Sequence, residues 1–370
     1  MSFCASTFSA KLISWFATAQ RALPWREAAN ARDPYRVLVS EIMLQQTTVA
    51  AVVPYYCRFI ERFPNVQTLA AADIHEVLPL WAGLGYYSRA RNLHACARVV
   101  MQKYHGEFPG KFEEVLALPG IGRYTAGAVL SIAFDQKVPI VDANIVRVLA
   151  RVLCLEGDLK NSANQKSLWD EATRLVNAAS TPSQFNSALM ELGALICVPK
   201  NPRCEICPAQ KFCCAFKHNR QNELPHITPR REAVVLQDVC AFVTKDNRVL
   251  LRRRSDEVAD KNWWRGMWEL PRTTRREGES THDALRRLFD NELVLQIEPG
   301  EKLKTMTHCV THHKIKLDCF AARIENFTPR KDVQFFAWVE IEALALPSVI
   351  RRLLRWLSTH DLANEQKRLL

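Results

Sequence analysis

The sequence predicts a mainly α-helical protein with a smaller C-terminal α+β domain. Between Pro34 and about His218, apolar residues recur at helical spacing in successive segments that proline and glycine separate. Residues 219–232 are polar and contain two prolines, which is typical of a linker. Beyond them, apolar and polar residues alternate as in strands. We therefore expect a first domain at residues 1–218, a linker at 219–232 and a second domain at 233–370.

The expected helices of the first domain follow one another with short breaks. They lie at residues 8–23, 34–48, 50–62, 68–79, 86–104, 111–118, 123–134, 143–155, 163–178 and 183–197. In the second domain, strands are expected at 233–243, 249–253 and 314–320, and helices at about 281–293 and 346–358.

Composition limits the partners and the compartment of the protein. The chain has 370 residues, a formal net charge of +11 and a pI near 9.1, which favours an anionic partner such as nucleic acid. Its first residues lack the cationic start and continuous apolar run of a signal peptide. Since no segment approaches the roughly 18 apolar residues of a membrane span, we expect a soluble cytoplasmic protein. We also expect it to be a monomer that associates with the nucleoid.

A tight turn joins two expected helices at Leu118–Arg123. Gly120 and Gly122 let the backbone approach another group closely and leave N–H groups pointing outward at a helix N-terminus. In a basic protein this arrangement suits a DNA phosphate, although an ordinary helix–helix turn can have the same sequence.

Two carboxylates, Glu41 and Asp142, are candidates for acid–base chemistry. Glu41 falls on the apolar stripe of its helix, where burial would raise its pKa, although a salt bridge to an arginine is the alternative. Asp142 precedes an apolar-periodic helix as an N-cap, and backbone N–H bonds there would lower its pKa. A protonated acid beside an ionised carboxylate is what cleavage of a glycosidic bond requires.

Five of the 12 cysteines are crowded between Cys197 and Cys214. The spacing of Cys197, Cys204, Cys207 and Cys213 can hold a [4Fe–4S] cluster or a zinc ion, and the single C-x2-C pair with wide gaps favours the cluster. Cys214 is expected to point elsewhere. The other seven are expected to be small core residues rather than a disulfide framework; they are Cys4, Cys57, Cys96, Cys154, Cys240, Cys309 and Cys319.

Together these segments resemble the MutY family of adenine DNA glycosylases, in the helix–hairpin–helix superfamily that includes endonuclease III. The motifs are LPWR at Leu23–Arg26, SEIMLQQT at Ser40–Thr47, GLGYYSRARN at Gly83–Asn92, LPGIGRYTAGA at Leu118–Ala128, VDAN at Val141–Asn144 and the cysteine loop at 197–213. The resemblance implies a six-helix barrel module, an iron–sulfur helical module and a Nudix-like domain. It also implies that the protein flips and removes adenine mispaired with 8-oxoguanine or guanine in double-stranded DNA.

The resemblance assigns roles to individual residues. Glu41 matches the acid that protonates adenine at N7, and Asp142 matches the carboxylate that stabilises the sugar cation. The adenine-pocket positions are Trp25, Arg26, Leu44, Gln46, Tyr124, Asn144 and Glu191. Gln45 and Tyr86 match residues that enter the duplex, and Gly120 and Gly122 match the phosphate-binding turn. Cys197, Cys204, Cys207 and Cys213 match the ligands of the [4Fe–4S] cluster.

The chain departs from the family pattern mainly in its second domain. Trp268–Pro271 resembles the Nudix strand, but the helix at 281–293 lacks the Arg-Glu and Glu-Glu pairs that hold magnesium, so we expect binding without hydrolysis. The family's Phe-Ser-His loop, which reads 8-oxoguanine, aligns with Val310, Thr311 and His312. Valine removes an aromatic wedge there, and threonine keeps the hydroxyl.

Two other functions compete with adenine removal. A bifunctional glycosylase–lyase needs a lysine in the second hairpin helix, where this chain has Tyr124, and no lysine occurs between Lys111 and Lys137. A non-catalytic iron–sulfur DNA-binding protein would need neither Glu41 nor Asp142. The sequence therefore predicts a monofunctional glycosylase.

Overall fold

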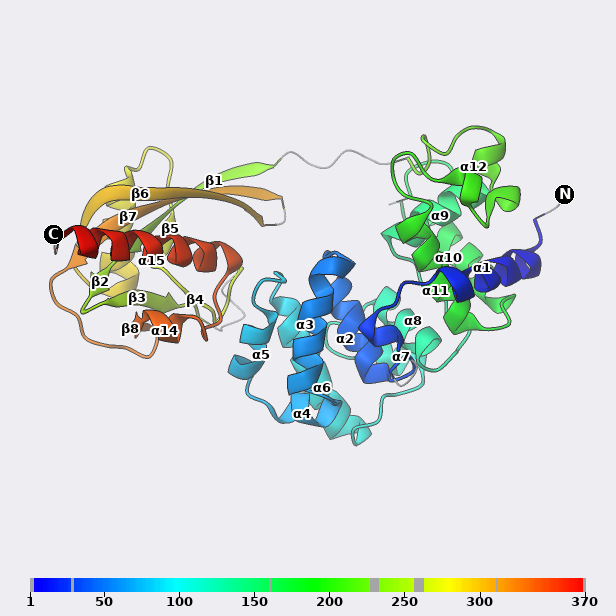
Figure 1. The fold of residues 1–370 in the computed structure, drawn as a ribbon, viewed down its shortest axis with the longest axis horizontal. Helices are drawn as coiled ribbons and strands as arrows, with labels where there is room; N and C mark the ends of the chain where they lie inside the picture. The colour runs from blue at the N-terminus through cyan, green and yellow to red at the C-terminus, as the bar shows by residue number, and fades with distance from the viewer. Residues whose placement is uncertain are drawn as a thin grey trace. The chain divides into compact units, whose positions relative to one another are not determined.

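Contacts divide the chain into two compact units, and Figure 1 labels most of their helices and strands. The computed structural model describes residues 3–27, 30–159, 161–226, 233–255, 263–310 and 312–368, with side chains described as far as residue 360. The first unit comprises residues 1–74 and 88–229, and the second comprises residues 75–87 and 230–370. Residues 75–87, which include α5 from His75 onward, thus group by their contacts with the C-terminal part of the chain.

Helices build the first unit. They are α1 (Ala5–Ala19), α2 (Pro34–Leu44), α3 (Val49–Arg62), α4 (Val66–Ala71), α6 (Ser88–Tyr104), α7 (Phe112–Leu116), α8 (Arg123–Ile132), α9 (Ala143–Leu153), α10 (Ser162–Asn177), α11 (Pro182–Leu195) and α12 (Cys214–Lys217). Short 3-10 turns lie at η1 (Pro24–Arg26), η2 (Cys204–Ile206) and η3 (Gln210–Phe212). The expected helix at 68–79 is two helices, α4 and α5 (Ile74–Trp81), of which the second lies almost wholly in the other unit.

The end of α2 differs from its prediction by four residues. The helix stops at Leu44 instead of residue 48, and Gln46 takes a left-handed φ of +57°. The buried Arg89 donates to the carbonyls of Ile42 and Met43 at 2.8 and 3.0 Å. A cation that binds the last carbonyls of a helix stabilises that terminus, so the end point is set by a residue of α6.

The hydrophobic core of the first unit positions the N-terminus of α9, which contributes to the candidate site. Apolar side chains of α1, including the fully buried Phe8 and Leu12, pack with those of α9, α10 and α11. Each such buried side chain contributes about 1.5–3 kcal/mol, so the packing holds the N-terminus of α9 against α11.

One disulfide joins Cys154, the C-cap of α9, to Cys214, the first residue of α12. The prediction that Cys154 is a core thiol is therefore wrong, while Cys214 does point away from the other cysteines of its loop. Among the remaining scattered thiols, Cys96, Cys240 and Cys319 are buried as expected, but Cys4, Cys57 and Cys309 are exposed.

The first half of the polar segment at 219–232 packs on the first unit. Leu224 is 2% exposed, and its carbonyl accepts a hydrogen bond from Arg151 of α9 at 2.9 Å. His226 forms an isolated β-bridge with Asp158. Residues 227–232 lie outside the described residues.

Among its described residues, the second unit contains two four-stranded sheets. The first has the order β5-β1-β7-β6, and in the second β3 pairs with β2, β4 and β8. The strands are β1 (Val234–Phe242), β2 (Thr244–Lys245), β3 (Arg248–Arg253), β4 (Trp268–Glu269), β5 (Arg272–Thr274), β6 (Ile297–Val310), β7 (His313–Ile324) and β8 (Val333–Ala337). The helices are α13 (Thr281–Leu288), which continues as a π-helical turn at Phe289–Leu293, α14 (Trp338–Ile341) and α15 (Ser348–Arg368).

Strand β1 separates two hydrophobic cores of this unit. Val239 and Ala241 face the core that contains α13, whereas Cys240 and Phe242 face the core that contains α15. Because successive side chains of a strand point to opposite faces, burial on both faces makes β1 apolar throughout its second half. Within the described residues, neither unit has a helix that is long and apolar enough to span a membrane. The fold class predicted from the sequence is confirmed.

Candidate active site and cysteine-lined cavity

One pocket of the first unit gathers the candidate catalytic residues. Its volume is about 830 Å³, and residues of η1, α2, α8, α9 and α11 line it. Every position assigned above to catalysis or to the adenine pocket lines it, together with Gln45: Trp25, Arg26, Glu41, Leu44, Gln46, Tyr124, Asp142, Asn144 and Glu191. The fold thus brings together residues that their sequence spacing could not place side by side.

Glu41 is a buried acid. It projects from α2 with 6% of its surface exposed, and the Tyr124 hydroxyl donates to its Oε2 at 2.6 Å. Burial raises the pKa of Glu41 to about 7, and the nearby Asp142 charge acts in the same direction. The hydrogen-bond partner is a phenol rather than an arginine, and the direction of the predicted pKa shift is confirmed.

Asp142 is the N-cap of α9, as predicted. Its Oδ1 accepts from the Ile145 N–H at 2.7 Å, and its Oδ2 accepts from the Asn144 amide at 3.0 Å. The predicted direction of its pKa shift is wrong. Burial raises the pKa of Asp142 and outweighs these hydrogen bonds, which favour the charged form.

The two carboxyl groups are nevertheless unequal. Asp142 accepts two N–H hydrogen bonds that stabilise a carboxylate, whereas Glu41 accepts one bond from a phenol. A single shared proton is therefore favoured on Glu41 and a negative charge on Asp142. The pair can supply an acid and an ionised carboxylate to the same bound group.

Glu191 forms a buried ionic cluster in the wall of the pocket. The Arg21 guanidinium donates to both of its carboxylate oxygens at 2.8 and 2.9 Å, and Arg26 donates to Oε2 at 3.0 Å. Although burial alone would raise the pKa of Glu191, these arginines hold it at about 2, so the group stays ionised. Arg21 was not singled out from the sequence; its place two residues before the LPWR motif is the signal that could have found it.

The helical hairpin presents an open helix N-terminus. Gly120 has a φ of +74°, and a Cβ there would lie 2.4 Å from the Cβ of Asn92, so the turn requires glycine. Gly122 caps α8, is exposed, and would hold a Cβ in open space. The Arg123 guanidinium lies 3.9 Å from the ring centroid of Trp169, which fixes the first residue of α8.

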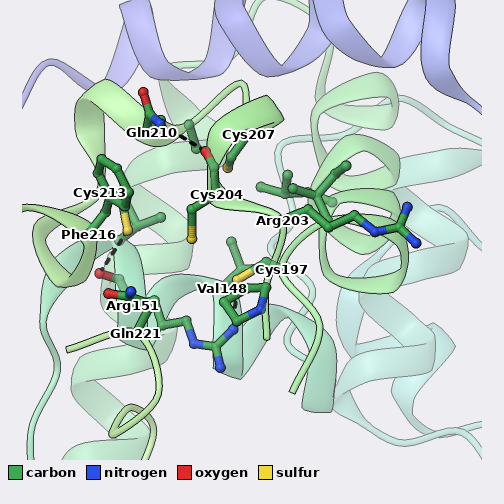
Figure 2. Close-up of a pocket in the computed structure, with 15 residues that line it drawn as sticks. Val148, Arg151, Cys197, Arg203, Cys204, Cys207, Gln210, Cys213, Phe216 and Gln221 are labelled. Carbon is green, nitrogen blue, oxygen red and sulfur yellow. Dashed lines mark hydrogen bonds between the residues drawn. The ribbon is translucent and has the colours of Figure 1, made fainter. Parts of the chain in front are cut away.

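Cys197, Cys204, Cys207 and Cys213 line one cavity, and Figure 2 shows their sulfur atoms turned toward the space between them. Arg151 holds the first ligand position: its Nη1 lies 3.3 Å from the Cys197 Sγ and donates to the Val198 carbonyl at 2.8 Å. Burial raises the pKa of the Cys207 thiol to about 12. Four thiols converging in an apolar wall fit a bound metal group chemically.

The spacing of the thiols bears on which group fits. In the part of the chain that the structure describes, no three His, Cys, Asp or Glu side chains are placed to hold a single metal ion. The sequence spacing of the four cysteines, a single C-x2-C pair with a wider gap on either side, is what favours a cluster over one zinc ion.

Helix α9 links the pocket and the cavity. Arg147 donates to the Cys197 carbonyl at 2.7 Å and, through Nη2, to the Asn144 side-chain oxygen at 2.9 Å. Asn144 in turn donates to Asp142. The first cysteine position and the candidate carboxylate are therefore connected through one arginine side chain.

The remaining predicted site residues lie in the second unit. Tyr86 is 43% exposed and has a φ of +47°, an uncommon conformation for a residue other than glycine. Val310 is half-buried at the end of β6, and His312 is exposed. Thr311 lies outside the described residues.

The Nudix-like part of the second unit carries paired carboxylates. Glu269 is fully buried, and Arg254 and Arg252 donate to its Oε1 at 2.7 and 3.2 Å. Burial raises the pKa of Glu269, but the arginines lower it overall. Glu292 is paired with Arg252 at 2.7 Å. Because guanidinium groups bind these oxygens, the two residues do not fit a magnesium site.

Comparisons with known proteins agree with both units. Residues 39–172 match the HhH-GPD superfamily of base excision DNA repair proteins, and residues 238–356 match the NUDIX domain. The structure of a thermostable thymine-DNA glycosylase is 34% identical and aligns with a TM-score of 0.52 over 58% of this chain and 97% of that one.

Several curated relatives are adenine DNA glycosylases. The adenine DNA glycosylase of Rattus norvegicus is 33% identical over 96% of this chain and 78% of its own length. That of Mus musculus is 42% identical over 68% of this chain, which spans about half (49%) of the mouse protein. The chain therefore belongs to the adenine DNA glycosylase family, with an HhH-GPD base excision repair fold followed by a Nudix domain.

Proposed function

We propose that this chain is a monofunctional DNA glycosylase that hydrolyses the N-glycosidic bond of adenine mispaired with 8-oxoguanine or guanine. The observation that carries the proposal is the shared pocket of Glu41, with a pKa of about 7, and Asp142, whose oxygens accept N–H hydrogen bonds. The family and both domain matches support it.

The pocket suits an extruded nucleotide. A stacked adenine hides its glycosidic bond, so the base must leave the helix, at a cost of a few kcal/mol. A volume of about 830 Å³ lies within the range of small-molecule sites and accommodates a purine nucleotide. The extruded base would be surrounded by Trp25, Leu44, Gln46 and the Arg26–Glu191 pair. Gln45 would enter the duplex and fill the gap that the base leaves.

The proposed reaction moves one proton twice. Glu41 gives its proton to adenine N7, so the C1′–N9 bond breaks with its electrons on a neutral base. Asp142 stabilises the oxocarbenium-like sugar that remains. Water then adds to C1′ and returns a proton to the Glu41 carboxylate. Tyr124 occupies the position at which a lyase carries its lysine amine, and its hydroxyl donates a hydrogen bond to Glu41. Because a phenol replaces the amine, no Schiff base forms.

Binding to DNA would use the first unit's hairpin and cysteine loop. The exposed N-terminus of α8 at Gly120 and Gly122 suits a phosphate, as do Lys200, Arg203 and Lys211 of the loop.

We assign Cys197, Cys204, Cys207 and Cys213 as ligands of a [4Fe–4S] cluster, which when bound supplies a rigid cross-link within this loop. Tyr86, Val310, Thr311 and His312 would read 8-oxoguanine. Residues 1–218 would therefore carry the cleavage chemistry, and residues 233–370, together with Tyr86, would recognise the oxidised base. We propose that the protein is a monomer and that it acts at the nucleoid.

A single-turnover assay on A:8-oxoguanine, A:G and A:T duplexes tests the proposal. We expect release of free adenine from both mispairs and none from A:T. Equal release from A:T, or none from either mispair, contradicts it.

Two further measurements test the other assignments. Borohydride should trap no stoichiometric covalent DNA complex, because no lysine is among the described residues that line the pocket; a trapped complex indicates a lyase. The purified protein should be brown, absorb near ~400 nm and contain iron. A colourless protein with one zinc ion contradicts the cluster assignment.

A further inference from the structure

The disulfide between Cys154 and Cys214 lies beside the cysteine-lined cavity. The two Cα atoms are 5.6 Å apart, within the normal range for a disulfide, and 60 residues separate them in the sequence. The closed loop contains α10, α11 and all four cavity cysteines. The covalent bond therefore encloses the whole proposed ligand loop.

The cross-link acts on the last residues of that loop. Cys213 lines the cavity and its Sγ lies 3.5 Å from the Arg151 carbonyl of α9, while the next residue, Cys214, is bonded to Cys154. Two consecutive loop residues are thus fastened to the last turn of α9. For the cavity to open on this side, both must move away from α9 together.

The non-covalent contacts around the cross-link are weaker. The ion pair of Arg220 with Glu156 at 2.6 Å joins the same two segments, but 64% of the Glu156 side chain is exposed, and such pairs contribute little. The Arg151 guanidinium binds the carbonyls of Leu224 and Val198, at the Cys197 end of the loop, and its contact with the other end is only the weak hydrogen bond from Cys213 to its carbonyl. Cys154 and Cys214 are both half-buried, so a small thiol or disulfide can reach them.

We propose that Cys154 and Cys214 form a redox-responsive lock on the cysteine-lined cavity, closed when oxidised and released when reduced. That the cavity holds a cluster rests on the proposed function; the lock itself does not. In the closed state, local opening of the loop end is suppressed, so a bound cluster is lost more slowly. The oxidant is a small disulfide such as oxidised glutathione, and the reductant is a dithiol.

The chemistry balances by thiol–disulfide exchange. One cysteine thiolate attacks a sulfur of oxidised glutathione, which breaks its S–S bond and releases one glutathione thiolate. The second cysteine thiolate attacks the mixed disulfide, forms the Cys154–Cys214 bond and releases the second glutathione thiolate. The two protons and two electrons of the cysteine thiols thus end on two glutathione molecules, and a dithiol reverses both steps.

Peptide mapping tests the bond directly in the full-length protein. After exposure to oxidised glutathione, alkylation in denaturant and digestion with trypsin, peptide 152–160 should be linked to peptide 212–217. Dithiothreitol added before alkylation should separate them. Both cysteines alkylated after the oxidising treatment overturns the proposal.

The rate of cluster loss tests the consequence. Absorbance near ~400 nm should decay in the presence of a chelator several-fold more slowly in the oxidised protein than in the protein treated with dithiothreitol. The Cys154→Ala/Cys214→Ala variant should decay at the rate of the reduced protein, with or without dithiothreitol. Equal rates in oxidised and reduced wild-type protein overturn the lock.

Two controls separate this proposal from the proposed function. Cys57→Ala/Cys309→Ala removes two exposed thiols and should behave as the wild type.

If the purified protein holds no cluster, thermal unfolding tests the lock in place of cluster loss. The oxidised wild type should then unfold several degrees higher than the reduced one, with no such difference in the Cys154→Ala/Cys214→Ala variant. An unfolding temperature that dithiothreitol leaves unchanged contradicts the lock.

Discussion

Replacing Glu41 with glutamine should stabilise the protein while it removes the proposed acid. Burial raises the pKa of Glu41 to about 7 from an ordinary 4.5. Because the folded pKa exceeds the unfolded one, the buried charge costs stability, and the free energy of unfolding falls as pH rises from about 4.5 to about 7. The full cost is roughly 2.5 × 1.36, or about 3 kcal/mol. Glutamine stays neutral and keeps an oxygen for the Tyr124 hydroxyl, so it escapes this cost.

Thermal unfolding of the two proteins at pH 5, 6, 7 and 8 measures the effect. For a unit of this size, about 3 kcal/mol corresponds to a shift of roughly 6–12 °C, which should be present in full at pH 8 and fall to about a quarter of that at pH 5. Glu61→Gln, on the exposed side of α3, is the matched control and should change the free energy by less than about 0.5 kcal/mol. A Glu41→Gln difference that is the same at every pH refutes the reasoning.

Three further predictions follow from the site. Single-turnover adenine release should fall about tenfold per pH unit above the pKa of about 7 of Glu41, and a flat profile between pH 6 and pH 9 contradicts this. Arg21→Gln should lower the free energy of unfolding by about 2–4 kcal/mol, because the buried Glu191 loses a bidentate partner. Arg174→Gln, in an exposed ion pair, is the control and should lower it by under about 1 kcal/mol. Equal losses in thermal unfolding argue against the buried ionic cluster. Gly120→Ala should lower the free energy of unfolding by about 2 kcal/mol or more, and Gly122→Ala by under about 1 kcal/mol. Thermal unfolding measures both, and a larger loss for Gly122→Ala contradicts the prediction.

Local signals predicted the elements that carry the chemistry. α8 begins at Arg123 and α9 is capped by Asp142 as expected, because a glycine turn and an N-cap act within one helical turn. β1 and β7 were visible for a similar reason, since alternation and continuous apolar runs are properties of the strand itself. The long β6 was missed: Pro299 and Gly300 interrupt it, and it has no fully buried residue along its length.

Tertiary contacts set the features that the sequence could not supply. The end of α2 depends on Arg89, which lies more than 40 residues further along the chain. The predicted direction of the Asp142 pKa shift was wrong because burial is a property of the packed unit rather than of the helix cap. The Arg21–Glu191 pair and the Cys154–Cys214 bond join residues 170 and 60 positions apart, and no local pattern marks either.

The most direct test of the proposed catalytic pair is Asp142→Asn on an A:8-oxoguanine duplex. Asparagine keeps an oxygen for the Ile145 N–H and so preserves the cap of α9, but it cannot carry the negative charge that we propose stabilises the sugar cation. We predict that single-turnover adenine release falls at least about a thousandfold, or ~4 kcal/mol, while affinity for the mispair stays within about threefold. Release at a rate comparable to the wild type would contradict a role for Asp142 in the reaction.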